Sequence, residues 1–523
     1  MGAATSVQDA AVCCGALQGL RKQANSMLPA PTYLQRGAKC TLGHRTANTN
    51  SGLIRLYEVD EDTLGKGSFG VVRKTVSKKT GTACVMKTIA KHGMDQDVLA
   101  FLANEIAIQE MCDHPNIARI YESFEDPAEI HIAMECCDGG DAFDYLQAQG
   151  GCLSEPDAKI MIHELLQAIF YLHSVQHVAH RDVKPENLLL KYRGAPMRDQ
   201  VVKLIDFGFA QSFEPGESSL SEVCGTPIYM APETVRDFYC EKCDVWSCGV
   251  ALFEFLSGDV PFSCTSPQKL LKMAAVRPIN LSGSEWDGVS SLAKALLRRM
   301  LAKEPGNRLS AGEALQHEWF REPAAPRVGE AGHPCGSGRI AQNLRDFSSL
   351  GDFQKAALRL AAYRLDDDHV QEHRSAFRAL DANGDGRLTL EELKDGCPEL
   401  GLSAGEAEGL FRELDVDGSG AIEYTEFLGA AVCKGALPRH ACWEAFRVCD
   451  RDGSGTIQAC EVEEVVERLC SKERSSSKES FTSTSAGSVS SGGSTYGNGS
   501  TDGSGADAQE LDFTRFMALL RAP

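Results

Sequence analysis

The pattern of apolar and polar positions separates the chain of 523 residues into a mixed region and a helical region. Across residues 57–320, short strand-like apolar runs alternate with helix-like segments, which predicts a domain containing both β-strands and α-helices. A Pro- and Gly-rich stretch at 321–338 is typical of a linker. Across 339–368, apolar positions fall at helical spacing with basic residues between them, so a basic amphipathic junction helix is expected there.

An internal repeat follows at residues 369–474, where acidic loops begin at Asp381, Asp415 and Asp450, 34 and 35 residues apart. Each loop has oxygen-bearing residues at positions 1, 3 and 5, Gly at 6 and Glu at 12, which is the ligand pattern of an EF-hand calcium loop. Three matches at one period leave acidic surface turns as the weaker alternative. We expect three calcium sites, with the position-7 residue giving its carbonyl, at Asp381, Asn383, Asp385, Arg387 and Glu392; Asp415, Asp417, Ser419, Ala421 and Glu426; and Asp450, Asp452, Ser454, Thr456 and Glu461.

The end of the chain carries a degenerate fourth unit at 506–523. In its register Arg515 takes position 12, and arginine has no carboxylate to give, so no calcium is expected there. Leu511 is still expected to pair with Ile457 of the third loop. The Ser-, Gly- and Thr-rich segment 475–505, predicted to be disordered, replaces the helix that should enter this unit.

A glycine-rich loop, Gly65-Lys66-Gly67-Ser68-Phe69-Gly70, follows the first strand-like run. Glycines let a backbone close over phosphates, although this spacing alone is weak evidence. The sequence continues into a second strand-like run at Val71, not into a helix, which favours a phosphate-covering hairpin over a dinucleotide site. Lys87, 17 residues after Gly70, and Glu105 suit a phosphate-binding lysine and its partner, although a random surface pair is the better reading of these two alone.

The strongest catalytic signal is the run His180-Arg181-Asp182-Val183-Lys184-Pro185-Glu186-Asn187. Asp182 can accept the proton of an attacking hydroxyl, and Lys184 can neutralise charge on a transferring phosphoryl group. Asn187 and Asp206, 19 residues apart, offer the hard oxygens that magnesium prefers. Chance agreement of all these positions in this order is negligible.

Residues 57–320 resemble a eukaryotic protein kinase domain, with Ala231-Pro232-Glu233 and Arg308 also at family positions. Lys184 and Gly225-Thr226-Pro227 resemble serine/threonine kinases. The resemblance implies a structural Glu233–Arg308 ion pair, and it implies that Lys87, Glu105, Asp182, Lys184, Asn187 and Asp206 are catalytic. ATP would be bound by Leu64, Gly65, Lys66, Gly67, Ser68, Phe69, Gly70, Val71, Val72, Val85, Lys87, Met134, Glu135, Cys137 and Asp141.

A kinase followed by a junction and EF-hands resembles the calcium-dependent protein kinase family of plants and protists. The implied fold is an α+β two-lobed protein kinase domain followed by an all-α EF-hand, calmodulin-like domain. The implied mechanism is an autoinhibitory junction that blocks the substrate cleft and is released when calcium binds. A pseudokinase scaffold that senses calcium, and an active kinase whose EF-hands merely buffer calcium, remain alternatives.

Two features concern substrates and activation. Asp141 and Glu186 match positions that receive a basic substrate residue in basophilic kinases, so protein substrates with a basic residue about three positions before the Ser or Thr are expected. Arg181 usually pairs with an activation-loop phosphate. Here one of Glu214, Glu217 and Glu222 can stand in for phosphate, or a neighbouring serine can be phosphorylated.

The net charge of -20 argues against nucleic acid as a partner. No run of 18 or more apolar residues and no secretory signal are visible, so a monomeric cytoplasmic protein with reduced cysteines is expected. The flexible arm 1–56 begins with a myristoylation pattern at Gly2, and Cys13 or Cys14 are palmitoylation candidates. These predict peripheral membrane attachment on the cytosolic side, with an unmodified arm as the alternative.

Overall fold

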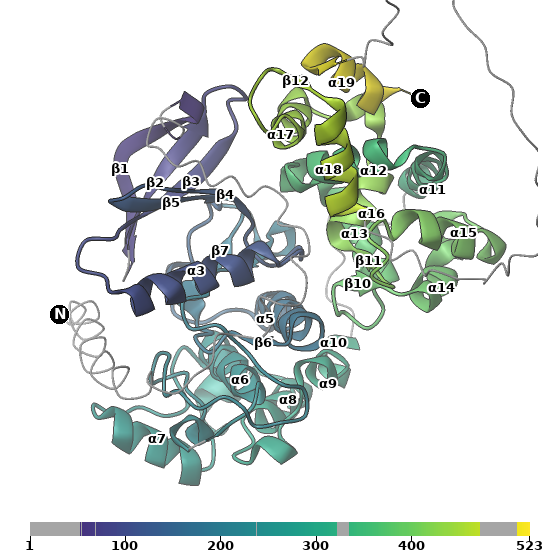
Figure 1. Cartoon of the computed structure of the whole chain (residues 1–523). Helices are drawn as coiled ribbons and strands as arrows, with labels where there is room; N and C mark the ends of the chain where they lie inside the picture. Colours follow the sequence, from purple (N-terminus) through teal and green to yellow (C-terminus); the bar gives the residue numbers. More distant parts are fainter. Residues whose placement is uncertain are drawn as a thin grey trace, which may run out of the picture.

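The structure is a computed structural model that describes residues 53, 55–67, 70–236, 238–321, 334–470 and 510–522. Two kinase-like lobes lie beside a helical calcium-loop portion (Figure 1). Gly2, Cys13, Cys14, Ser68, Phe69 and the insertion at 475–505 fall outside the described residues. Within the described part, no helix is long and apolar enough to cross a membrane.

The first lobe is a five-stranded antiparallel sheet with the strand order β1-β2-β3-β5-β4. Its strands are β1 (Tyr57–Gly67), β2 (Gly70–Ser77), β3 (Ala83–Ala90), β4 (Ile120–Glu125) and β5 (Glu129–Glu135). The predicted hairpin after the glycine-rich loop is therefore present. Helix α3 (Gln96–Glu110) follows β3 and begins where the Asp95 side chain accepts a hydrogen bond from the Val98 amide at 3.0 Å.

The second lobe is mainly helical, and its buried core includes Trp246, Trp286 and Trp319. Its cysteines are free, as are all cysteines of the described part, and Cys243 is buried at the start of α6. The helices are α4 (Ala142–Ala148), α5 (Glu155–Tyr171), α6 (Lys242–Ser257), α7 (Pro267–Val276), α8 (Ser291–Met300), α9 (Ala311–Leu315) and α10 (Glu318–Arg321). Two small antiparallel ladders frame the catalytic loop: β6 (Val178–Ala179) with β9 (Gln211–Ser212), and β7 (Leu188–Leu190) with β8 (Val202–Leu204).

The calcium-loop portion consists of paired helix–loop–helix units. Its elements are α13 (Asp367–Leu380), β10 (Arg387–Leu388), α14 (Leu390–Leu400), α15 (Ala404–Leu414), β11 (Ile422–Glu423), α16 (Tyr424–Ala431), α17 (Arg439–Cys449), β12 (Thr456–Ile457), α18 (Ala459–Leu469), β13 (Leu511–Asp512) and α19 (Phe513–Arg521). β10 pairs with β11, and β12 pairs with β13. Leu511 lies opposite Ile457 in the second pair, which confirms the predicted partner of the third loop.

The junction is two helices, α11 (Pro334–Ser348) and α12 (Asp352–Tyr363), where the sequence pattern predicted one. The chain breaks at Gly351, whose amide donates to the Gln354 side chain at 3.3 Å and so starts the second helix. Leu344 and Phe347 of α11, with Leu358 of α12, lie in one apolar core with α16 and α17. The junction is therefore part of the calcium-loop portion in this conformation.

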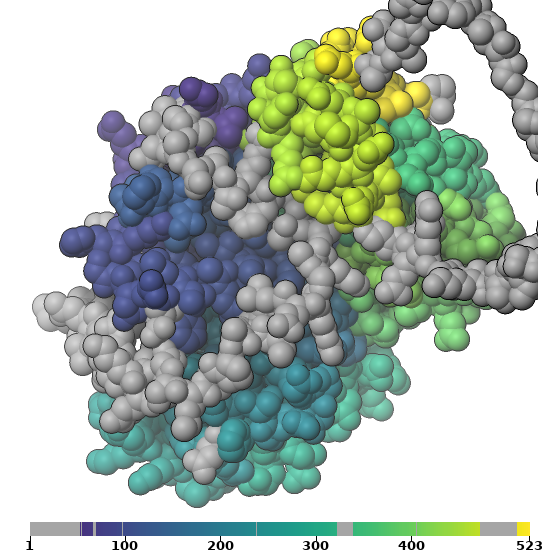
Figure 2. Space-filling view, in the orientation of Figure 1, coloured from purple at the N-terminus to yellow at the C-terminus, as the bar shows by residue number. Residues whose placement is uncertain are grey.

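The calcium-loop portion is docked on one side of both lobes (Figure 2). Arg119 donates to the carbonyls of Tyr363 and Leu365, at 3.2 and 3.3 Å, and the Tyr363 hydroxyl donates to the Ile120 carbonyl at 2.8 Å. Tyr363 is also buried in an apolar cluster with Tyr121 of β4. These contacts fix the end of the junction against β4 and the loop that precedes it.

Candidate active site and calcium loops

The lysine and glutamate predicted to hold phosphates are in contact across the first lobe. The Lys87 ammonium on β3 lies 2.9 Å from a Glu105 carboxylate oxygen on α3. Burial opposes the charged lysine, but Glu105 and Asp206 outweigh it and raise the pKa of Lys87. The contact sets α3 in the position that places a cation beside bound phosphates.

Residues of the catalytic loop converge on the Asp182 carboxylate. One oxygen accepts from the Lys184 ammonium at 2.7 Å, and the other accepts from the Thr226 hydroxyl at 2.8 Å. The Asn187 side chain donates to the Asp182 backbone carbonyl at 2.8 Å. Because Thr226 belongs to the activation segment, these bonds hold that segment beside the proposed base.

The loop before this carboxylate is held by a buried aspartate on α6. Asp244 accepts from the backbone amides of His180 and Arg181, at 2.8 and 2.7 Å, and contacts the His173 ring at 2.8 Å. Arg181 has a φ of 66°, a left-handed conformation that a non-glycine residue adopts at some cost. The two amide bonds to Asp244 help to offset that cost.

Asp206 begins the second predicted metal segment with a φ of 64°. Phe207 is buried and packs edge-on against His180, with ring centroids 5.1 Å apart. The carboxylate of Asp206 contributes to the raised pKa of Lys87, which places the two groups in one electrostatic environment. The donor set fits magnesium, because Asp206 and Asn187 provide the hard oxygens this ion takes alongside substrate phosphates.

Those predicted nucleotide residues that the structure describes lie on β1, β2, β3 and β5 or in the segment directly after β5. Val85 lies opposite Met134 in the β3–β5 ladder. The Glu135 carboxylate is occupied by Lys191 and Lys203, each at 2.9 Å, which leaves its backbone as the part able to meet a nucleotide. Burial raises the pKa of the Cys137 thiol. A Cβ at Gly70 would lie 2.3 Å from the Thr88 carbonyl oxygen, which explains glycine at the start of β2.

Arg181 has an acidic partner in the activation segment. Its guanidinium lies 3.5 Å from the Glu222 carboxylate, and its second nitrogen donates to the Tyr239 hydroxyl at 3.2 Å. That hydroxyl donates in turn to the Glu222 carbonyl at 2.6 Å. Of the three candidate acids, Glu222 is the one this contact identifies, while Glu214 and Glu217 are exposed.

A third acid, which sequence reasoning missed, lies close to the two acids expected to bind basic substrate residues. Burial raises the pKa of Asp141 and of Glu186, with Asp141 adding to the shift of Glu186. Glu254 on α6 accepts from the Tyr229 hydroxyl at 2.7 Å, and Glu186 contributes to its raised pKa after burial. No short motif signals Glu254, because it lies 68 residues beyond Glu186. Glu254 is buried, so it adds negative charge behind the two predicted acids.

The predicted ion pair between Glu233 and Arg308 is present and buried, with one N–O distance of 2.9 Å. It lies away from the catalytic carboxylate and anchors the end of the activation segment to the second lobe.

Carboxylate oxygens converge in two of the three calcium loops. In the second loop those of Asp415, Asp417 and Glu426 lie within 4.8 Å of one another, and in the third so do those of Asp450, Asp452 and Glu461. The Ser419 and Ser454 hydroxyls donate to the position-7 carbonyls of Ala421 and Thr456, both at 2.9 Å. These oxygen sets fit calcium, which takes several hard ligands from one loop.

The first loop carries Asn383 at position 3, where the other two loops carry aspartate. The Asp381 carboxylate accepts from the backbone amides of Gly384 and Gly386, both at 2.9 Å. The backbone amide of Asn383 donates to the Glu392 carboxylate at 3.2 Å. Burial and the nearby Asp385 raise the pKa of Asp381 to about 7. The side chain of Arg387 at position 7 reaches Glu423 of the second loop at 3.0 Å. The expected ligands are together on one loop, and with asparagine at position 3 this loop lacks one of the three carboxylates, at positions 1, 3 and 12, that converge in the other two.

Sequence reasoning also missed the kinase residues that receive the calcium-loop portion. Asp113 accepts from the Thr425 amide at 2.9 Å, and Glu122 accepts from Arg447 at 2.7 Å. Both acids are buried in a lobe-to-domain contact. The pairs are separated by more than three hundred positions, so periodicity carried no signal for them.

Comparisons with known proteins agree with this arrangement. Residues 57–320 match the protein kinase domain family, residues 370–432 match an EF-hand domain pair, and residues 444–466 match an EF hand. Calcium-dependent protein kinase 3 of Plasmodium yoelii yoelii is 33% identical over 410 residues, covering 78% of this chain and 74% of that protein. Calcium-dependent protein kinase 34 of Arabidopsis thaliana is 33% identical over 413 residues, covering 78% and 76%. The chain therefore belongs to the calcium-dependent protein kinase family.

Proposed function

We propose that the chain is a calcium-activated serine/threonine protein kinase that transfers the γ-phosphate of ATP to protein hydroxyls. The observation that carries this is the Asp182 carboxylate held by Lys184 and Thr226 beside an assembled Lys87–Glu105 pair. When bound, magnesium held by Asp206 and Asn187 would neutralise phosphate charge. Asp182 would orient the substrate hydroxyl and take its proton, and Lys184 would stabilise negative charge on the transferred group.

Calcium regulation is proposed to act through three ions, one in each complete loop. The converging oxygens of the second and third loops support two of these sites, and the ligand types of the first support the third. The fourth unit has Arg515 where a carboxylate is needed, and its contribution is structural: β13 pairs with β12, and Phe516 and Leu520 of α19 lie in the apolar core.

The junction is proposed to be the autoinhibitory element. In this conformation α12 is buried among α16, α17 and α18, which supports a state in which the calcium-loop portion grips it. Its end contacts Arg119, Ile120 and Tyr121, on the β4 side of the kinase. In the inhibited state the junction would block the substrate cleft, and calcium binding would change its position and free the cleft.

Phosphate transfer to a basic Ser/Thr peptide, with and without free calcium, tests the proposal. We expect calcium-dependent transfer by the full chain and calcium-independent transfer after removal of the residues beyond 336, with thermal unfolding confirming that the shortened protein is folded. Absence of transfer would support a scaffold. Transfer by the full chain that ignores calcium would support an EF-hand buffer instead.

We propose that Glu222 replaces an activation-loop phosphate. Glu222→Gln removes the charge that faces Arg181 and is expected to lower kcat about fivefold, since a contact to a charged group contributes roughly 1 kcal/mol. Glu217→Gln, in the same segment and exposed, is the control and should leave kcat unchanged. Equal kcat for both variants, with phosphate found by mass spectrometry on Ser218, Ser219 or Ser221, would favour phosphorylation.

Asp141 and Glu186 are proposed to bind a basic substrate residue. The double change Asp141→Asn with Glu186→Gln is expected to raise KM roughly tenfold for a peptide with arginine three positions before the serine, because charge-assisted contacts are lost. The same enzyme should show an unchanged KM for a peptide with alanine at that position. A peptide library that selects acidic or proline-directed sequences would contradict the assignment.

Attachment of the arm to the cytosolic face of a membrane is proposed from sequence alone. A myristoyl group on Gly2 gives marginal binding, so a palmitoyl group on Cys13 or Cys14 would supply the second anchor. Labelling with an alkyne myristate should mark the parent and not Gly2→Ala. Equal labelling of both would remove the proposal.

A further inference from the structure

An arginine of the junction lies among the ligands of the second calcium loop. Arg359 of α12 has one guanidinium nitrogen 3.0 Å from a Glu426 carboxylate oxygen and 3.6 Å from Asp417. Its other terminal nitrogen donates to Glu423 at 2.6 Å. These acids stand at positions 12, 3 and 9 of the loop, so one guanidinium contacts three positions that calcium would use.

Burial makes this contact more than a surface ion pair. Arg359 is 2% exposed and Glu426 is 1% exposed. A buried carboxylate costs several kcal/mol unless a cation or several donors accompany it. The loop also carries Asp415 and Asp417, whose negative charges add to the repulsion. Glu426 also accepts from the backbone amides of Val416 and Glu423, at 3.1 and 3.0 Å, so the guanidinium adds a positive charge to a carboxylate that amides already hold.

The third loop provides a comparison within the same chain. Glu461, the position-12 residue there, accepts from the backbone amides of Arg451 and Gln458, at 2.7 and 3.0 Å. The neighbouring Arg451 side chain pairs with Glu464, which is not one of the predicted ligands. The second loop therefore differs from the third by a junction side chain placed on its ligands.

We propose that Arg359 is a built-in competitor of calcium at the second loop, so that ion and guanidinium occupy the same carboxylates in alternative states. The inference rests on the proposed calcium binding of that loop. Because coupling between two ligands is reciprocal, calcium at this loop weakens the hold on α12 to the same extent that Arg359 weakens calcium binding. Through this side chain, the position of the junction then sets the calcium threshold of the second loop.

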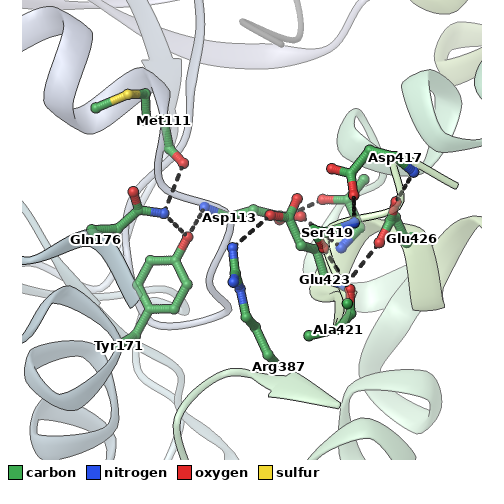
Figure 3. A network of polar contacts seen from close by, with 12 residues as sticks. Met111, Asp113, Tyr171, Gln176, Arg387, Asp417, Ser419, Ala421, Glu423 and Glu426 are labelled. Atoms are coloured by element: carbon green, nitrogen blue, oxygen red, sulfur yellow. Dashed lines mark hydrogen bonds and ion pairs between the residues drawn. The ribbon is translucent and has the colours of Figure 1, made fainter. Parts of the chain in front are cut away.

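The same loop touches the kinase on its other side, as Figure 3 shows for the polar contacts around it. The Thr425 amide, at position 11, donates to Asp113 at 2.9 Å, and the Asp113 amide donates to the Tyr171 hydroxyl at 3.0 Å. Gln176 donates to that hydroxyl at 2.7 Å and to the carbonyl of Met111, directly after α3, at 3.4 Å. Exchange of Arg359 for calcium thus takes place in a loop that is also bonded to the end of the helix carrying Glu105.

Calcium titration of the full chain tests the proposal without relying on activity. By calorimetry against a competing chelator, Arg359→Gln is expected to bind calcium about tenfold more tightly at one site, a typical coupling magnitude. Lys355→Gln is the matched control. It removes a buried cation one turn earlier on α12, whose partner Glu413 belongs to no calcium loop, and should leave every constant at the parent value.

Three further variants make the outcome unambiguous. Glu426→Gln should have one calcium site fewer than the parent. An unchanged number of sites would contradict the proposal that this loop binds calcium. In that background, adding Arg359→Gln should change no remaining constant. Unchanged or weaker calcium binding in Arg359→Gln, while Glu426→Gln does lose a site, overturns the competition. Arg359→Lys keeps the charge without the two-pronged contact and should give about a threefold gain; no gain there overturns it as well.

Discussion

Replacement of Asp182 by Asn is expected to lower kcat by about 10²- to 10⁴-fold, the usual contribution of a positioned general base. Asparagine has nearly the same shape but cannot take the proton of the substrate hydroxyl. Its amide would also face the Lys184 ammonium, now 2.7 Å from the carboxylate, and would replace an ion pair by two opposed donors. Radiolabelled phosphate transfer at saturating ATP and calcium measures the loss.

The interpretation requires that the variant remain folded and able to bind calcium. Calcium titration of Asp182→Asn should therefore match the parent, and a single cooperative thermal transition should show that the variant is folded. Asp138→Asn is the control for a nearby acid, because its pair with Lys74 is exposed at both ends and such pairs contribute little. Activity of Asp182→Asn above one tenth of the parent would show that another group accepts the proton.

The catalytic residues were predictable because phosphoryl transfer needs particular side chains at short, fixed spacings. Asp182, Lys184 and Asn187 lie within one loop, and Lys184 and Asn187 both contact Asp182 in the structure. The sequence evidence for Lys87 and Glu105 as a pair was weaker, since only their place in the order of motifs supported that prediction. The calcium loops were predictable for the same reason, because each ligand set lies within twelve residues.

The environment of the junction was not predictable, because its partners are distant in sequence. Basic residues between apolar ones indicate a helix with a solvated cationic face, yet Lys355 and Arg359 are both buried. Their acidic partners, Glu413 and Glu426, lie 58 and 67 positions further along the chain. Helical periodicity reports which positions share a face, whereas the burial of that face depends on a tertiary contact. The break at Gly351 was missed because one glycine in a helical pattern is often tolerated.

Replacement of Arg447 by Met is expected to weaken docking of the third calcium loop on the first kinase lobe by roughly 3–5 kcal/mol, the cost of leaving a buried charge unpaired. Arg447 donates to Glu122 at 2.7 Å and to Glu444 at 2.6 Å, and the Tyr57 hydroxyl also bonds to Glu122. Glu122 is 1% exposed, so water cannot replace the guanidinium. Hydrogen exchange of β4 and α17, together with the thermal midpoint, measures the effect.

A charge-neutral double variant separates the ion pair from simple packing. Adding Glu122→Gln to Arg447→Met should recover most of the loss, because the uncompensated carboxylate is what costs free energy. Arg451→Met, which removes an exposed arginine four residues later, should behave like the parent. Equal losses in the single and double variants would show that side-chain volume, and not charge, holds the contact.

The pH dependence of docking follows from the same pair. Burial alone would raise the pKa of Glu122, but Arg447 and Arg364 outweigh it and hold the pKa below the ordinary value of 4.5. A depressed pKa contributes stability that is complete above the ordinary value and is lost as pH falls through the folded one. Hydrogen-exchange protection of α17 in the parent should therefore decline below about pH 4.5. The double variant lacks this ion pair, so the part of the decline that the pair causes should be absent from it. Arg447 precedes Asp450, the first expected ligand of the third loop, by three residues. The Arg447–Glu122 contact therefore connects the start of that loop to β4.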